Sequence, residues 1–114
     1  RRNLGTSKFS VDQMYAAAKW IAVNMVVGNM GWVYVGERRR MPLGKRCLYC
    51  GDMECEEKNI SIQLLASTLK SGLFTVVPDG TSRFMHSAVF SFLAAEGMNE
   101  WMDAANYHIF FGIS

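Results

Sequence analysis

The chain has 114 residues, of which half are hydrophobic and 19% are charged, and its net charge is +2. This composition excludes a disordered or collagen-like chain, and the small net charge excludes a nucleic-acid binder that works by bulk charge alone. No apolar stretch approaches the roughly 18 residues that a membrane span needs. The length predicts one domain over residues 1–114, and because the chain begins with arginine we expect a segment of a longer protein.

The first predicted element is a helix over residues 10–27. Ser10 and Gln13 have the spacing of a capping box, in which each residue satisfies the backbone N–H of the other. Apolar residues then recur at helical spacing, and Gly28 followed by Asn29 is a typical helix end.

Short strands are predicted at residues 31–36 (GWVYVG), 73–77 (LFTVV) and 107–111 (YHIFF). Each is a run of aromatic and β-branched residues, which favour extended backbone. Glycines bound the first run, and a Pro-Asp-Gly turn follows the second.

Further helices are predicted between and after these strands. Asn59 is expected to cap a second helix that ends at Gly72. A third helix, apolar on most sides, is expected over residues 81–95 and closed by Gly97, with a short helix over 98–105. The order of elements predicts an α+β fold, with a small three-stranded sheet packed against three to four helices and a zinc knuckle.

All three cysteines lie within nine positions, at Cys47, Cys50 and Cys55. An odd, clustered set does not fit a secreted disulfide scaffold, so we expect a reducing, intracellular location in cytoplasm or nucleus. The CxxC spacing lets two thiolates reach one metal ion, with Cys55 folding back as a third ligand. Lys45 and Arg46 are expected to lower the thiol pKa, so the sequence predicts a structural Zn²⁺ site.

The fourth zinc ligand must come from elsewhere in the chain. His86 is favoured over His108, and Asp52 or Glu54 stay open as alternatives. Each histidine also fits the simpler role of a packed core residue. With His86 as ligand, the ion would hold the cysteine loop on the third helix and restrict the unfolded chain.

The charges are polarised along the sequence. Residues 37–46 contain five basic residues and one acid, whereas residues 52–57 contain four acids and no base. Basic side chains contact phosphates and aromatic rings stack on unpaired bases. The candidate nucleic-acid contacts are therefore Arg38, Arg39, Arg40, Lys45, Arg46 and Trp32. The alternatives are a core role for Trp32 and a solvated loop, although three adjacent arginines are not expected all to find carboxylates within the chain.

Large apolar side chains are numerous, with eight Met, seven Phe, four Tyr and three Trp. Such residues are enriched at protein interfaces, although they also fill small cores. We expect a homodimer or a complex with another chain, through Met98, Trp101 and Met102 or through the apolar third helix.

These features together predict a zinc-stabilised domain that binds nucleic acid, or a regulatory interaction domain. RNA is favoured over DNA because no predicted helix is basic. The alternative is a protein-interaction or oligomerisation domain with an acidic partner and purely structural zinc. A thiol-dependent enzyme is less favoured, because the CxxC motif lacks a thioredoxin-like context and no phosphate-binding loop is present.

Overall fold

The computed structural model describes residues 9–103, with the backbone alone for 101–103. This part of the chain has an α+β fold with three α-helices, a four-stranded sheet and three short 3-10 helices. The α-helices are α1 (Val11–Gly28), α2 (Ile62–Leu69) and α3 (Ser87–Asp103). The strands are β1 (Trp32–Tyr34), β2 (Cys47–Tyr49), β3 (Phe74–Val76) and β4 (Thr81–Phe84). The 3-10 helices are η1 (Arg38–Arg40), η2 (Cys50–Met53) and η3 (Glu56–Lys58).

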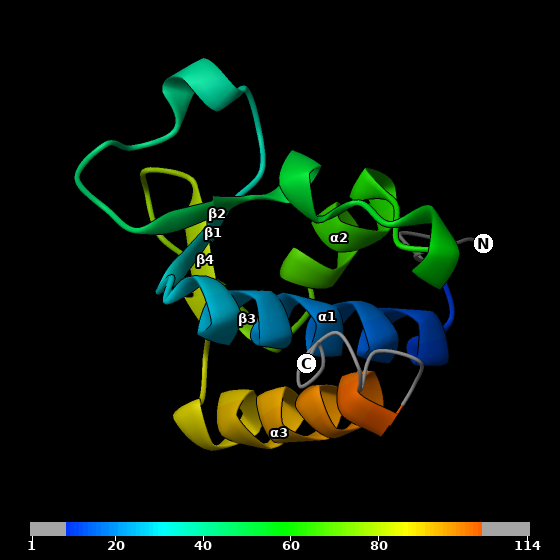
Figure 1. Cartoon of the computed structure of the whole chain (residues 1–114). Helices are drawn as coiled ribbons and strands as arrows, with labels where there is room; N and C mark the ends of the chain where they lie inside the picture. The colour runs from blue at the N-terminus through cyan, green and yellow to red at the C-terminus, as the bar shows by residue number, and fades with distance from the viewer. Residues whose placement is uncertain (1–8, 104–114) are drawn as a thin grey trace, which may run out of the picture.

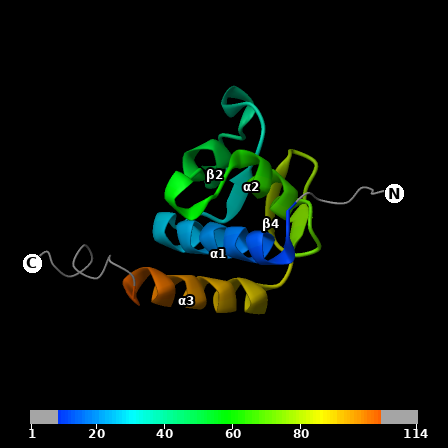
Figure 2. The same ribbon diagram turned by 90° about the vertical axis from the view of Figure 1, so that its right-hand side faces the viewer.

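Helix α1 lies between α2 and α3, as the two views in Figure 1 and Figure 2 show. The sheet has the strand order β2-β1-β4-β3, in which β1 and β2 are parallel and the other neighbours are antiparallel. The loop that carries η1 projects away from the helices, above the sheet in Figure 1. Among the described residues, no helix is both long and apolar enough to cross a membrane.

Helix α1 forms as the sequence predicts. The Ser10 hydroxyl accepts a hydrogen bond from the Gln13 backbone N–H at 3.0 Å, and the Ser10 N–H donates to Gln13 Oε1 at 2.8 Å. The helix ends at Asn29, whose φ of 53° is left-handed. The capping box and the terminating residue are therefore confirmed, because both depend on local sequence alone.

Helix α2 begins two residues later than a cap at Asn59 implies. Asn59 adopts a left-handed φ of 59° and ends η3. Ser61 is the actual N-cap and accepts from the Leu64 N–H at 3.1 Å. The Ile62 backbone N–H, which has no acceptor within the helix, donates to Glu54 Oε2 at 2.9 Å.

The sheet has one more strand than the sequence predicts, and the start of the third helix is corrected. Residues 81–84 form β4, not the first turn of a helix, and α3 begins at Ser87. The turn after β3 closes a β3–β4 hairpin, in which Gly80 has a φ of 90°. Strand β2 is also unpredicted, and the strand expected at 107–111 lies outside the described residues.

Small and branched residues of α1 form the centre of the core and pack against α2 and one face of the sheet. The fully buried core residues include Ala17, Ala18 and Ile21 of α1, Val33 of β1, and Leu64 and Leu65 of α2. Helix α3 continues past Gly97 to Asp103, so Gly97 does not end it and no separate helix begins at residue 98. Gly97 is instead a point of close helix approach: a Cβ there would lie 2.4 Å from Val23 Cγ2.

Candidate nucleic-acid interface

The two faces of the sheet differ in chemistry. Side chains alternate along a strand, and Val33 and Phe74 belong to the buried core, so they define the inner face. The outer face is defined by residues that alternate with these inward-facing ones along the strands, namely Trp32, Cys47 and Arg83. Trp32 pairs in register with Cys47 of β2, and Arg83 comes from β4 on the other side of β1. The outer face therefore gathers an aromatic ring, a thiol and a cation.

Trp32 is half-buried on the outer face and carries two cations. Lys45 Nζ lies 3.7 Å from the centre of the Trp32 ring, and the Arg83 guanidinium carbon lies 5.0 Å from it. Lys45 also pairs with Asp79 at 2.8 Å and donates to Thr81 Oγ1 at 3.0 Å. The hydrogen bond from Lys45, with those from Thr81, lowers the pKa of the Asp79 carboxyl to about 2. Lys45 is thus held in place by an ionised partner.

The three arginines of η1 all find carboxylates within the chain. Arg38 pairs with Asp52, and Arg39 and Arg40 pair with Glu37 at 3.2 and 3.1 Å. The expectation that they could not all do so is therefore wrong. All five side chains are more than half exposed, and ion pairs of this kind contribute little free energy. A phosphate can compete for these arginines at low cost.

Arg46 and Arg83 form no ion pair with a carboxylate in residues 9–100. Arg46 is exposed and its Nε donates to the Asn29 carbonyl at 2.7 Å. Arg83 is exposed and borders a cleft of about 420 Å³ that Met25 and Met30 also line. Sequence reasoning missed Arg83 because it placed this residue in a helix. The Pro-Asp-Gly turn was the available signal, since a hairpin puts residues 81–84 beside the predicted strands.

The predicted zinc ligands are not brought together. Cys47 lies on the outer face near Lys45, whereas Cys50 is fully buried in the core on the opposite side. The reason is that β2 extends the backbone over Cys47–Tyr49, and Cys50 then begins η2 with its side chain in the core. Cys55 is partly buried and forms a β-bridge with Ile60.

The remaining zinc candidates do not complete a site. His86 is exposed and precedes α3, and His108 lies outside the described residues. Within residues 9–100, no three His, Cys, Asp or Glu side chains form a group that could hold a metal ion. As placed, these described residues form no zinc site, and zinc binding stays a prediction from the sequence.

The pKa values of the Cys47 and Cys50 thiols are set by burial more than by the neighbouring cations. Desolvation raises the pKa of the Cys50 thiol to about 12. Desolvation also raises the pKa of Cys47 and outweighs the opposing effect of Lys45. The expectation that basic neighbours lower the thiol pKa is therefore wrong for these two residues, which stay protonated.

The predicted interface residues on the last turns of α3 are only partly described. Met98 is half-buried, and the side chains of Trp101 and Met102 lie outside the described residues. The exposed large apolar side chains lie on α1, in loops and on β3, and Phe92 is the one on the described part of α3.

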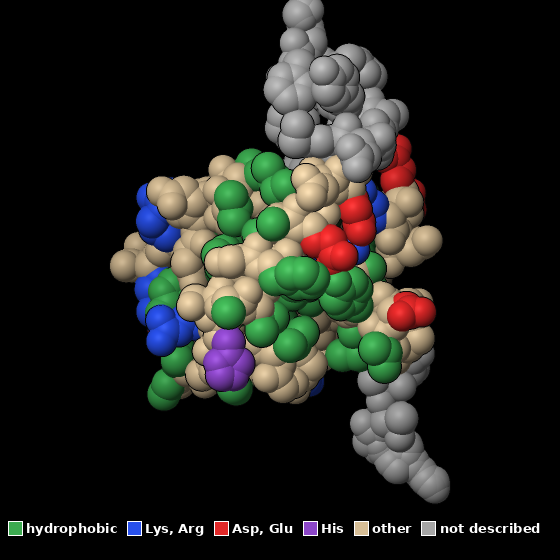
Figure 3. All heavy atoms as spheres, turned by 90° about the horizontal axis from the view of Figure 1, so that it is seen from below, with side chains coloured by type: hydrophobic (Ala, Val, Ile, Leu, Met, Phe, Trp, Pro, Cys, Tyr) green, Lys and Arg blue, Asp and Glu red, His purple; other side chains and the backbone are tan. Residues whose placement is uncertain are grey.

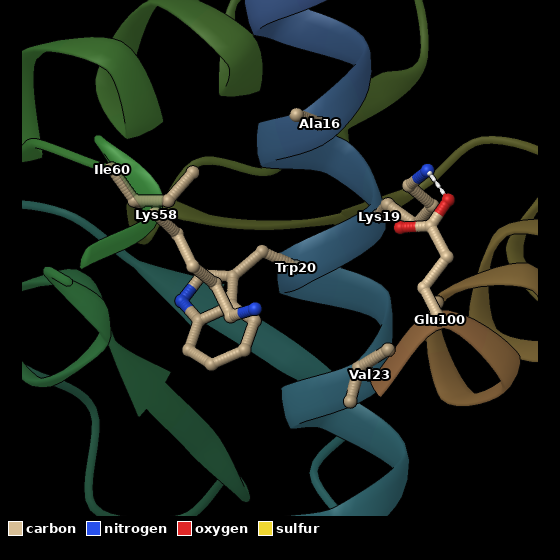
Figure 4. A pocket seen from close by; sticks show the side chains of 8 residues that line it. Ala16, Lys19, Trp20, Val23, Lys58, Ile60 and Glu100 are labelled. Carbon is tan, nitrogen blue, oxygen red and sulfur yellow. Dashed lines mark hydrogen bonds and ion pairs between the residues drawn. The ribbon is translucent and has the colours of Figure 1, made fainter. Parts of the chain in front are cut away.

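A second cleft, of about 310 Å³, lies between α1, η3 and the end of α3 (Figure 4). Trp20 and Lys58 lie on one side of α1 and Lys19 and Glu100 on the other. Lys19 is paired with Glu100, and the Trp20 indole N–H donates to the Met53 carbonyl at 2.8 Å. These polar groups are engaged within the chain, so this cleft is a weaker candidate site than the outer face.

No protein-family model matches the chain, and comparison with curated proteins and with solved structures likewise gave no match.

Proposed function

We propose that this domain binds single-stranded nucleic acid, with RNA favoured, through the outer face of the sheet and the adjoining basic loop. The observation that carries the proposal is the half-buried Trp32 ring with Lys45 and Arg83 over it. Aromatic rings on a sheet stack on unpaired bases, and neighbouring cations contact the phosphates. None of the three α-helices has a basic residue in its last turn, and only Lys19 lies within one of them, so a recognition helix is not supported.

The two cations at Trp32 have different freedom. Lys45 is held by Asp79 and Thr81, whereas Arg83 has no carboxylate partner in the described chain. We infer that an incoming base displaces Arg83 from the Trp32 ring and that Arg83 then contacts a phosphate. Stacking of this kind contributes about 1–3 kcal/mol per base. Arg46 supplies a second guanidinium that has no carboxylate partner in the described residues, although its Nε donates to the Asn29 carbonyl.

The arginines of η1 are a second set of phosphate contacts, available when their exposed pairs with Glu37 and Asp52 open. The salt dependence of binding distinguishes phosphate contacts by Arg46 and Arg83 alone from contacts that also include the three η1 arginines. Two phosphate contacts, from Arg46 and Arg83, predict a log–log slope of about −1.4 for a single strand. Adding the three η1 arginines predicts a slope of about −3.5.

The test is fluorescence anisotropy of a labelled single-stranded RNA, and of DNA with the same sequence, titrated with protein at several salt concentrations. The double variant R46A/R83A should weaken binding at least about tenfold and flatten the salt slope by about 1.4. The matched control K58A/K70A removes two exposed lysines that belong to η3 and the end of α2, not to the sheet, and should change affinity less than threefold. Absence of RNA and DNA binding at low salt, or equal losses in both double variants, would overturn the proposal.

A regulatory contact with an acidic protein is the second candidate, because the η1 arginines already pair with carboxylates. The triple variant R38E/R39E/R40E distinguishes the two. Under the nucleic-acid proposal this variant weakens RNA binding and reduces the log–log salt slope from about −3.5 toward about −1.4. If wild type binds no nucleic acid and the triple variant loses only a protein partner in a pull-down, the acidic-partner function takes its place.

A further inference from the structure

The cleft that Arg83 borders, of about 420 Å³, lies where β4 leads into α3. Its lining is mostly apolar and includes the methionines Met25, Met30 and Met85 and the phenylalanines Phe84 and Phe90. Met25 and Phe84 are buried, Met30 and Phe90 are half-buried, and Met85 is 49% exposed. The cleft therefore has apolar walls that reach from the core to the surface, which is typical of a small-molecule or base pocket.

Two residues join this cleft to the Trp32 ring. Gly31 lines the cleft and directly precedes Trp32 in the chain. Arg83 lines the cleft as well, and its guanidinium carbon lies 5.0 Å from the centre of the Trp32 ring. The ring and the cleft are thus neighbouring sites that share one cation, and this cation has no carboxylate partner among residues 9–100.

We propose that the cleft accepts a second nucleobase, next along the strand to the base stacked on Trp32, and that Arg83 contacts the phosphate linking the two nucleotides. This inference rests on the proposed nucleic-acid binding and adds a second base subsite to it. Single strands are recognised by splaying their bases apart and stacking them on protein side chains. Methionine suits such a wall because its thioether is polarisable and its side chain adapts to the group that it contacts.

The chemistry of the cleft fits a base better than an acyl chain or an apolar peptide side chain. A base has apolar faces and polar edges, and the cleft combines its apolar walls with the exposed polar residues Arg83 and Ser87. Figure 3 shows the face that α3 covers, with Lys and Arg side chains gathered at the edge beyond the histidine and hydrophobic side chains beside them. Such a basic edge attracts the phosphates of a strand, whereas an uncharged chain gains nothing from it.

The test fills the cleft without changing any charge. A Cβ at Gly31 would meet no atom within 4 Å, and the φ of Gly31 is not left-handed, so Gly31→Leu adds a side chain there without strain. In the anisotropy titration with single-stranded RNA, this variant should weaken binding at least about fivefold, because one base loses its contacts. The log–log salt slope should not change, because every phosphate contact remains.

Gly72→Leu is the matched control. It makes the same substitution at a position that is also open around the Cβ, in the turn between α2 and β3 and away from the outer face. Its affinity for the RNA should stay within about twofold of wild type. Circular dichroism must show both variants folded, and Met85→Ala, with an expected loss of about threefold, replaces Gly31→Leu if that variant unfolds.

Photochemical cross-linking to thiouridine-substituted RNA locates the bases in the wild-type protein. Peptide mass spectrometry should find one cross-link at Trp32 and a second at Met85 or Phe90, and Gly31→Leu should remove the second while the first remains. If wild type binds neither RNA nor DNA, the proposed function and this inference fall together. If wild type binds and cross-links only at Trp32, or if Gly31→Leu binds as tightly as wild type, the second subsite alone is overturned. A loss of affinity with a flatter salt slope also counts against it, because Gly31→Leu would then have displaced Arg83 instead of a base.

Discussion

Replacing Gly97 with alanine tests how closely α3 packs on α1. An alanine Cβ at this position would lie 2.4 Å from Val23 Cγ2, 3.0 Å from Lys19 Cγ and 3.4 Å from the Lys19 carbonyl oxygen. Carbon atoms in good contact are about 3.5–4.0 Å apart, so the methyl group does not fit without movement. Val23 has few alternative rotamers in a helix, and the Lys19 carbonyl moves only with α1. The two helices must therefore separate.

Two opposing contributions set the magnitude. Alanine is preferred over glycine within a helix by about 1 kcal/mol. Overpacking a well-filled core costs about 1–3 kcal/mol, and a contact at 2.4 Å belongs at the upper end of that range. We expect Gly97→Ala to lower the free energy of unfolding by about 1–2 kcal/mol, and the thermal midpoint by about 4 °C for each kcal/mol.

The assay is urea unfolding followed by circular dichroism. Gly72→Ala is the control, because no atom lies within 4 Å of a Cβ there, and it should change stability by less than about 0.5 kcal/mol. The double variant V23A/G97A removes the clash, so its destabilisation should be smaller than the sum of the two single changes by at least about 1 kcal/mol. A Gly97→Ala protein as stable as wild type, or more stable, would refute close packing at this crossing.

Three further predictions concern pH, thiol reactivity and capping. Folding lowers the pKa of Asp79 from its usual value near 3.8 to about 2, so its pair with Lys45 stabilises the fold above pH 4 and this contribution is lost as the pH falls to 2. In Asp79→Asn, the urea midpoint should therefore fall less steeply than in wild type as the pH is lowered from 4 to 2. At pH 8 iodoacetamide should modify the partly exposed Cys55 in the folded protein but not the buried Cys50, whose thiol pKa is about 12, and peptide mass spectrometry in the presence and absence of urea reads this out. Ser10→Ala should cost about 1 kcal/mol of unfolding free energy, as judged by the same urea assay, because the first turn of α1 loses a hydrogen-bonded cap.

Elements that local sequence specifies were predictable. Helix α1 has its start at Ser10, its end at Asn29 and its apolar repeat written within twenty consecutive residues. Strands β1 and β3 are likewise short β-prone runs with turn residues beside them. The α+β class follows from these elements without any knowledge of their contacts.

Elements that form only by pairing with distant segments could not be predicted from the sequence. Residues 81–84 (TSRF) precede a long apolar helix and continue its pattern, so periodicity alone assigns them to it. They become β4 because they pair with β1 and β3, a contact that sequence periodicity does not encode. The same holds for β2, whose residues pair with β1 residues fifteen positions earlier in the chain.

The candidate site shows the same division. The residue types of a zinc site and their spacing are present, but the spacing between Cys47 and Cys50 gathers two ligands only in a turn. Pairing of residues 47–49 with β1 extends the backbone and sends the two thiols to opposite faces of the sheet. Trp32, Lys45 and Arg46, which the sequence offers as candidate nucleic-acid contacts, do lie close together, because the parallel pairing of β1 and β2 brings their segments side by side.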